Sequence, residues 1–205
     1  MHQKTSISSG KKAGEAKKAL IMLHGRGASA EDILSLSPYL NVKDFAVIAP
    51  QATNHTWYPY SFLSAPSQNE PWLSSAIKVI GDLVQDIVDQ GIVKENIYFV
   101  GFSQGACLTL EYITRNADRW GGAVAFTGGL IGDQLYKQNY QGDFKGTPVY
   151  IGTSNPDPHV PVKRVQESEE VLQAMGAKVT VDIFPNMGHT VSQLEIDQAN
   201  KLIFN

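Results

Sequence analysis

NIYFVGFSQGACLTL, residues 96–110, combines a strand pattern, a sharp turn and a helix pattern without interruption. The β-forming residues 97–100 lead into the turn GFSQG at 101–105, and small and apolar residues suited to a helix follow. In a Gly-x-Ser-x-Gly turn between a strand and a helix, the tight turn strains the backbone and exposes the serine hydroxyl above the sheet. A side chain at either glycine would collide with the neighbouring strand or helix. The pattern therefore predicts a nucleophile elbow at Ser103.

Strand and helix patterns alternate along the rest of the chain. Apolar runs typical of strands that are buried in a parallel sheet occur at 19–23, 45–49, 123–126 and 149–151, and a partly alternating strand at 178–184. Helix patterns, several with capping signals, occur at 29–40, 69–91, 103–115, 161–176 and 192–203. This alternation predicts the α/β class, with a doubly wound, mostly parallel sheet and right-handed crossovers.

The length of 205 residues is enough for one domain with a full core and too short for two ordinary ones. Residues 1–18 are polar and predict a flexible or edge segment, either a frayed end or a short edge hairpin. Residues 19–205 contain no internal repeat, low-complexity tract or linker. We therefore expect a single α/β domain over 19–205.

Composition excludes several classes of protein. The 42% hydrophobic and 18% charged residues are typical of a folded globular protein. The net charge of -3 argues against a nucleic-acid partner, which requires a basic face. No apolar run approaches the roughly 20 residues that span a bilayer, so no stable membrane insertion is expected. The single cysteine, Cys107, cannot form an internal disulfide, which predicts a cytoplasmic location.

Metal and cofactor motifs are not found in the sequence. The five histidines have no spacing to Cys, His or carboxylate residues that resembles a zinc site. The glycine-rich turns lack the dinucleotide-binding pattern after a first strand, and there is no P-loop lysine. The sequence therefore predicts neither a metal nor a nucleotide cofactor.

Three polar residues follow predicted strands, where the functional residues of an open parallel sheet gather. Ser103 follows the strand at 97–100, Asp157 follows the strand at 149–151, and His189 follows the last strand. A serine hydroxyl becomes a good nucleophile when a neutral imidazole takes its proton, which assigns the general base to His189. Asp157 would hold the imidazole tautomer and stabilise the imidazolium.

Each assignment has an alternative. For Ser103 it is an unreactive serine at a helix N-terminus, and for His189 it is a loop histidine held by the backbone. Asp157 lies between two prolines, so its alternative is a turn residue. The remaining candidates for the base and the acid are His24, His55, His159, Asp133, Asp143 and Asp182.

The tetrahedral oxyanion of acyl transfer needs two preorganised donors. The backbone N–H of Gln104, directly after the nucleophile, is one donor. The loop after the first strand supplies the other, for which we select the N–H of Arg26.

Cys107 is interpreted as a small buried hydrophobe. Long loops in compact domains are usually functional, and the aromatic loop at 51–70 predicts a substrate wall or a loop anchor. Candidate substrate-binding residues are Trp57, Tyr58 and Met187.

Four motifs together resemble the phospholipase/carboxylesterase family of α/β-hydrolases, which includes acyl-protein thioesterases and small bacterial carboxylesterases. They are LIMLHGRGAS at 20–29, GFSQGA at 101–106, DPHVP at 157–161 and NMGHTVS at 186–192. The resemblance implies an α/β-hydrolase fold in which Ser103, Asp157 and His189 form the triad and the amides of Arg26 and Gln104 form the oxyanion hole. It also implies no cap domain, and only the segment 128–148 separates the strands where one would be inserted. The loop around Trp57 is more similar to bacterial carboxylesterases, which argues against a long-acyl protein substrate.

These observations predict a serine hydrolase that cleaves carboxylic esters, or thioesters or lysophospholipids, through an acyl-serine intermediate. The expected partner is a small-molecule ester, and exposed aromatic residues are compatible with a homodimer. One alternative resembles the dienelactone hydrolases, which cleave lactone or C–C bonds but commonly carry cysteine at the elbow. The other is a catalytically silent, ligand-binding member of the same fold.

Overall fold

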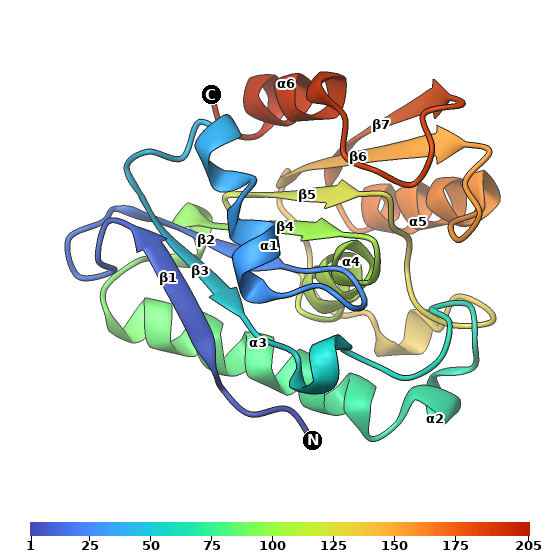
Figure 1. Ribbon diagram of the computed structural model, residues 1–205, viewed down its shortest axis with the longest axis horizontal. Helices are drawn as coiled ribbons and strands as arrows, with labels where there is room; N and C mark the ends of the chain where they lie inside the picture. Colours follow the sequence, from blue (N-terminus) through green and yellow to red (C-terminus); the bar gives the residue numbers. More distant parts are fainter.

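One seven-stranded sheet organises the protein, and the computed structural model describes all residues from 1 to 205. Its order is β1-β3-β2-β4-β5-β6-β7 (Figure 1). Strands β2 to β7 run parallel to their neighbours, and only β1 is antiparallel, beside β3. The strands are β1 (Ser6–Gly10), β2 (Lys18–Leu23), β3 (Phe45–Pro50), β4 (Ile97–Phe102), β5 (Gly122–Phe126), β6 (Pro148–Asn155) and β7 (Lys178–Pro185).

Helices cover both faces of the sheet, which confirms the doubly wound α/β class. They are α1 (Ala30–Leu34), α2 (Pro66–Asn69), α3 (Trp72–Asp89), α4 (Gln104–Arg115), α5 (Val162–Ala174) and α6 (Gln193–Leu202), with 3-10 helices η1 (Ser37–Tyr39), η2 (Thr53–His55), η3 (Lys94–Asn96) and η4 (Lys137–Asn139). Buried residues of α3, α4 and α5 share one core of 37 residues, and those of α1 and α6 share a second core of 18 residues. None of the helices combines the length and apolar character required to cross a membrane.

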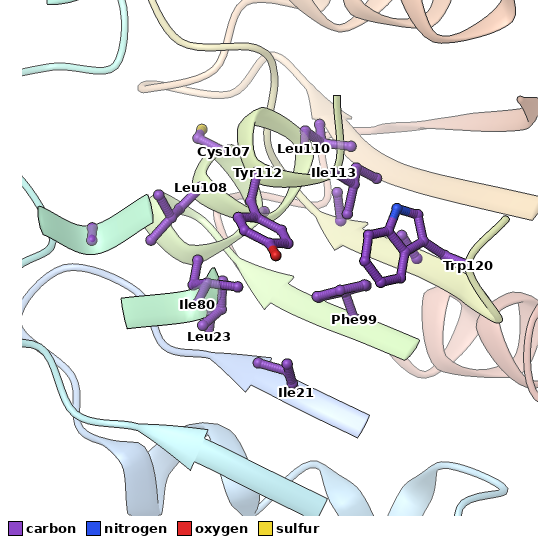
Figure 2. Packing of buried hydrophobic residues seen from close by; sticks show 14 of the residues in the cluster. Ile21, Leu23, Ile80, Phe99, Cys107, Leu108, Leu110, Tyr112, Ile113 and Trp120 are labelled. Atoms are coloured by element: carbon purple, nitrogen blue, oxygen red, sulfur yellow. The ribbon is translucent and has the colours of Figure 1, made fainter. Parts of the chain in front are cut away.

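Aromatic packing fixes α4 against the central strand β4. Phe99 of β4 meets Trp120 edge to face, with ring centroids 5.2 Å apart, and lies 5.8 Å from the ring of Tyr112 on α4. All three rings are buried, and Figure 2 shows Phe99 and Tyr112 between the strand and the helix, with Trp120 beside Phe99. Such pairs contribute about 0.5–1.5 kcal/mol each beyond the area that they bury. This packing holds α4 against the strand that precedes it.

Several boundaries differ from the sequence-based expectations. The helix expected at 29–40 ends at Leu34, and Pro38, which has no N–H to continue an α-helix, lies in the separate η1. The strand expected to end at Ile151 continues to Asn155, because β6 pairs with β7 along its whole length. The capping boxes at Ser29 and Ser192 are both present, as their sequences predict.

Two glycine substitutions are expected to have opposite effects on stability. A Cβ at Gly105 would lie 2.1 Å from the carbonyl oxygen of Leu23, so Gly105→Ala forces α4 away from β2. Such overpacking lowers the free energy of unfolding by about 1–3 kcal/mol. A Cβ at Gly81, inside α3, would have its nearest neighbour, the Tyr112 ring, at 3.9 Å. Gly81→Ala should raise the free energy of unfolding by roughly 0.5–1 kcal/mol.

Urea unfolding followed by circular dichroism measures both changes. Equal effects of the two alanines would contradict the tight contact between α4 and β2.

Candidate active site

Ser103 lies in a strained turn between β4 and α4. Its backbone has φ of 54° and ψ of -116°, a left-handed conformation that is unfavourable for a residue with a side chain. The serine N–H donates to the carbonyl oxygen of Phe126 at 3.0 Å, which ties the turn to β5. A Cβ at Gly101 would lie 2.3 Å from the carbonyl oxygen of Gly105, so the turn closes only with glycine there. This is the geometry that the Gly-x-Ser-x-Gly pattern predicts.

His189 and Asp157 extend a hydrogen-bonded path from the serine hydroxyl. Ser103 Oγ lies 2.8 Å from Nε2 of His189, and Nδ1 of the same ring lies 2.8 Å from Oδ2 of Asp157. The carboxylate accepts at Nδ1, so a neutral imidazole carries its proton there and leaves Nε2 to accept from the hydroxyl. Three side chains that follow β4, β6 and β7 thus meet at one edge of the sheet.

The carboxylate of Asp157 is held in its ionised form. Its Oδ1 accepts the backbone N–H groups of His159 and Val160, each at 2.8 Å, and its side chain is fully buried. Burial raises the pKa of Asp157, but the hydrogen bonds from His189 and the two amides outweigh it, and the net pKa is lowered. The group is therefore a carboxylate throughout the neutral pH range.

Two rings enclose the imidazole of His189. The ring centroid of Phe102 lies 5.2 Å away, and that of His159 lies 4.9 Å away in an edge contact. The preceding Gly188 donates its N–H to Ser154 Oγ at 3.0 Å, which ties the loop to β6. These contacts hold the ring plane between the hydroxyl and the carboxylate. The neighbouring His159 ring was not anticipated beside His189 from the sequence, because its position depends on the loop conformation.

The loop after β2 passes beside the nucleophile. A Cβ built on Gly25 would lie 3.6 Å from the Cβ of Ser103. His24 is buried, which lowers its pKa; its Nε2 accepts from the Ala52 N–H at 3.1 Å, and its Nδ1 donates to the Gly25 carbonyl at 2.7 Å. In a trans peptide the N–H points opposite to the C=O, so the N–H of Arg26 is directed away from His24. That N–H has no hydrogen-bond partner within the protein.

The guanidinium of Arg26 binds the aromatic loop. It donates to Thr56 Oγ1 at 3.0 Å and to the carbonyl oxygens of Pro59 and Tyr60 at 2.9 and 2.6 Å. Its donors are thus used to hold the loop that follows β3. This role of the side chain was missed in the sequence, where only the backbone N–H of Arg26 was selected.

The side chain of Gln104, at the start of α4, forms hydrogen bonds with the same loop. Its Oε1 accepts the Trp57 N–H at 2.8 Å, and its Nε2 donates to the Tyr58 carbonyl at 2.8 Å. Its backbone N–H is the first of the helix and has no partner inside it. Both residues selected as backbone donors therefore also fix the aromatic loop with their side chains.

Replacing Gln104 with alanine should leave two buried backbone groups, at Trp57 and Tyr58, without their partners. We expect the free energy of unfolding to fall by about 1–3 kcal/mol. We also expect kcat/KM to fall, although the backbone N–H at position 104 remains. The matched control is Gln85→Ala on the exposed face of α3, where the amide bonds only Asp89 and the change should stay within about 0.5 kcal/mol. Equal losses in the two variants would contradict this role.

A cavity of about 830 Å³ lies beside the Ser103, His189 and Asp157 side chains, and we call it the first cavity. Ser103, Asp157 and His189 line it together with Tyr58, and Cys107 is also among the lining residues. Burial raises the pKa of Cys107 to about 12, so this group is a neutral thiol. The structure therefore agrees with its interpretation as a small buried hydrophobe.

The other two candidate substrate-binding residues do not line the first cavity. Trp57 is fully buried, and its indole N–H donates to the His24 carbonyl at 2.9 Å, so it anchors the loop. Met187 is half-buried in the loop before His189. No group of three or more His, Cys, Asp or Glu side chains is arranged to hold a metal ion.

A mostly parallel sheet whose central strand ends in this serine turn defines an α/β-hydrolase. The chain belongs to the phospholipase/carboxylesterase family, whose family model matches residues 2–204. It is similar to a crystal structure of a phospholipase/carboxylesterase from Dyadobacter fermentans DSM 18053, with 55% identity, a TM-score of 0.98 and coverage of 100% of this chain and 98% of that one.

The names of curated relatives are consistent with membership of this family. Acyl-protein thioesterase 1 of Saccharomyces cerevisiae is 30% identical over 72% of this chain and 73% of its own length. A probable carboxylesterase SOBER1-like protein of Arabidopsis thaliana is 28% identical over 88% of this chain and 76% of its own length. The chain is an esterase-type hydrolase, which confirms the predicted family, fold and enzyme class. The roles of individual residues stay predictions.

Proposed function

We propose that this protein hydrolyses carboxylic esters through an acyl-Ser103 intermediate, with His189 as general base and acid and Asp157 as its orienting carboxylate. The observation that carries the proposal is the path from Ser103 Oγ through the imidazole to Asp157, with two contacts of 2.8 Å. The ionised state of Asp157 supports it, because a carboxylate has no proton to donate to Nδ1, accepts from its N–H and stabilises the imidazolium by its negative charge.

In the acylation step, Ser103 Oγ attacks the acyl carbon while Nε2 of His189 takes the hydroxyl proton. The carbonyl oxygen becomes an oxyanion that accepts from the N–H groups of Arg26 and Gln104. The tetrahedral intermediate then collapses, the bond to the leaving oxygen or sulfur breaks, and Nε2 returns the proton to that atom. The products of this half-reaction are a free alcohol or thiol and acyl-Ser103.

Deacylation repeats these steps with water in place of the serine. His189 takes a proton from water, the hydroxide attacks the acyl-Ser103 carbonyl, and the same two amides bind the second oxyanion. Collapse releases the carboxylic acid and returns the proton to Ser103 Oγ. The site therefore requires no group beyond the residues named.

A second candidate function is thioester hydrolysis. Relatives are named acyl-protein thioesterase, and an ester and a thioester of one acid form the same acyl-Ser103. The two substrate classes differ only in the atom that receives the proton from His189. We propose a small-molecule substrate in both cases.

Hydrolysis of p-nitrophenyl esters from acetate to octanoate tests the proposal, with the matched thioacetate as a second substrate class. We expect turnover of the esters and, where deacylation is the slower step, a burst of p-nitrophenol stoichiometric with the enzyme. Turnover of lactones but not of open-chain esters would favour the dienelactone-hydrolase alternative. Binding of an ester without its hydrolysis would favour a silent member of the fold.

A further inference from the structure

A second cavity adjoins the first one at His189. Its volume is about 360 Å³, and we call it the second cavity. Its apolar walls are Ala28, Ile33, Leu36, Phe102 and Val191. It shares Gly25, Ala28, Phe102 and His189 with the first cavity, so the imidazole is part of the wall of both.

The two cavities lie on opposite faces of the sheet. Ile33 of the second cavity belongs to the core beneath α1 and α6, and Leu36 and Val191 pack against that core. Tyr58 and Cys107 of the first cavity belong to the core beneath α3, α4 and α5. The edge that carries Ser103 and His189 therefore has an apolar space on either side.

Ester hydrolysis requires space for two substrate groups, the acyl chain and the leaving group, on different sides of the reacting carbon. The tetrahedral carbon bound to Ser103 Oγ carries an oxyanion, an acyl chain and a leaving group. The oxyanion faces the backbone donors, and the other two substituents point away from each other. A site with one cavity on each side of the His189 imidazole can hold both.

The need to protonate the leaving group indicates which cavity holds the leaving group and which holds the acyl chain. Ser103 and Gln104 line only the first cavity, whereas His189 lines both. The leaving atom must lie beside His189 Nε2 to receive a proton, and the acyl chain has no such requirement. A group in the second cavity contacts the His189 ring without contacting Gln104. The acyl chain then extends along the first cavity toward Cys107, one helical turn beyond the nucleophile.

We propose that the second cavity is the leaving-group subsite and that it binds a compact, uncharged, apolar alcohol or thiol. This inference rests on the proposed function. The five apolar walls favour an apolar group, and 360 Å³ is at the small end of the range for ligand pockets. The carboxylate of Asp32 lines the same cavity and repels an anionic leaving group. Hydrogen bonds from the backbone and side chain of Ser29 lower the pKa of Asp32, so it is ionised at neutral pH.

Matched filling variants test the assignment. Leu36→Trp fills the second cavity, and Leu63→Trp makes the same change in the first cavity, where Leu63 is a lining residue. One substrate series keeps the acetyl group and lengthens the alcohol from methyl to hexyl. The other keeps p-nitrophenol and lengthens the acyl chain. kcat/KM is measured for wild type and both variants with each series.

We expect Leu36→Trp to lower kcat/KM for the longest alcohol, relative to methyl acetate, by about 10–200-fold, the effect of a methylene-sized misfit. Its dependence on acyl length should follow that of the wild type, because every ester of that series carries the same p-nitrophenol leaving group. Leu63→Trp should show the opposite pattern. Wild-type enzyme should also prefer 4-acetoxybenzamide to the anionic 4-acetoxybenzoate.

Val191→Phe fills the second cavity from its other wall and replaces Leu36→Trp if that variant does not fold. An unchanged dependence on alcohol length in the folded variant would overturn the proposal, and so would a change only in acyl preference. Absence of ester hydrolysis by the wild type is a separate outcome, which would reject the proposed function itself.

Discussion

Ser103→Ala should lower kcat for ester hydrolysis by roughly six orders of magnitude, the size of the loss when a comparable triad serine is removed. The substitution deletes the atom that forms the acyl intermediate and leaves Nε2 of His189 without its 2.8 Å partner. The oxyanion donors are backbone groups and stay in place, so a residual rate above that of water is expected.

The folded structure should tolerate this change. Alanine at position 103 has the same backbone strain as serine, since the positive φ arises from the turn. The free energy of unfolding should therefore change by less than about 0.5 kcal/mol. Ser8→Ala, at an exposed serine of β1, is the control and should keep wild-type activity. Activity near the wild-type level in Ser103→Ala would remove this residue from the mechanism.

Asp157→Asn should lower kcat by about four orders of magnitude, as in the serine protease template. The Asn oxygen is needed by the N–H groups of His159 and Val160, which bond Oδ1 at 2.8 Å. Its NH₂ group then faces Nδ1 of His189, and a donor there requires the imidazole to carry its proton on Nε2. That tautomer donates to Ser103 and cannot take its proton.

Steady-state kinetics across neutral pH would measure the loss in Asp157→Asn, and KM should change much less than kcat. Asp133→Asn is the matched control, because this exposed carboxylate accepts only from the nearby Tyr136 hydroxyl. It should retain wild-type kinetics. A drop of less than about tenfold in Asp157→Asn would assign the orienting role to another acid.

The fold could be predicted largely from the pattern of apolar runs. Alternating strands and helices specify a parallel sheet, and the capping boxes at Ser29 and Ser192 mark two helix starts. An edge segment was among the expectations for residues 1–18, but the partner strand of β1 could not be predicted, because Ser6–Gly10 is largely exposed and has no apolar signal. Its pairing with β3 depends on long-range backbone hydrogen bonds, which local sequence does not encode.

The site was predictable where a topological rule applied. Ser103, Asp157 and His189 follow three strands whose carboxyl ends share one edge, and the structure brings their side chains together. No such rule predicts which side chains of the aromatic loop face the first cavity. Trp57 and Tyr58 are both buried, but only Tyr58 lines the first cavity, and the placement of the loop depends on its contacts with His24, Arg26 and Gln104.

Fluorophosphonate labelling with peptide mapping by mass spectrometry tests the central claim, that the imidazole of His189 makes the Ser103 hydroxyl a nucleophile. We expect one adduct on Ser103 in the wild type, no adduct in Ser103→Ala and strongly slowed labelling in a folded His189→Gln variant. A folded wild-type protein that does not label, or that labels at another residue such as Cys107, would contradict the claim.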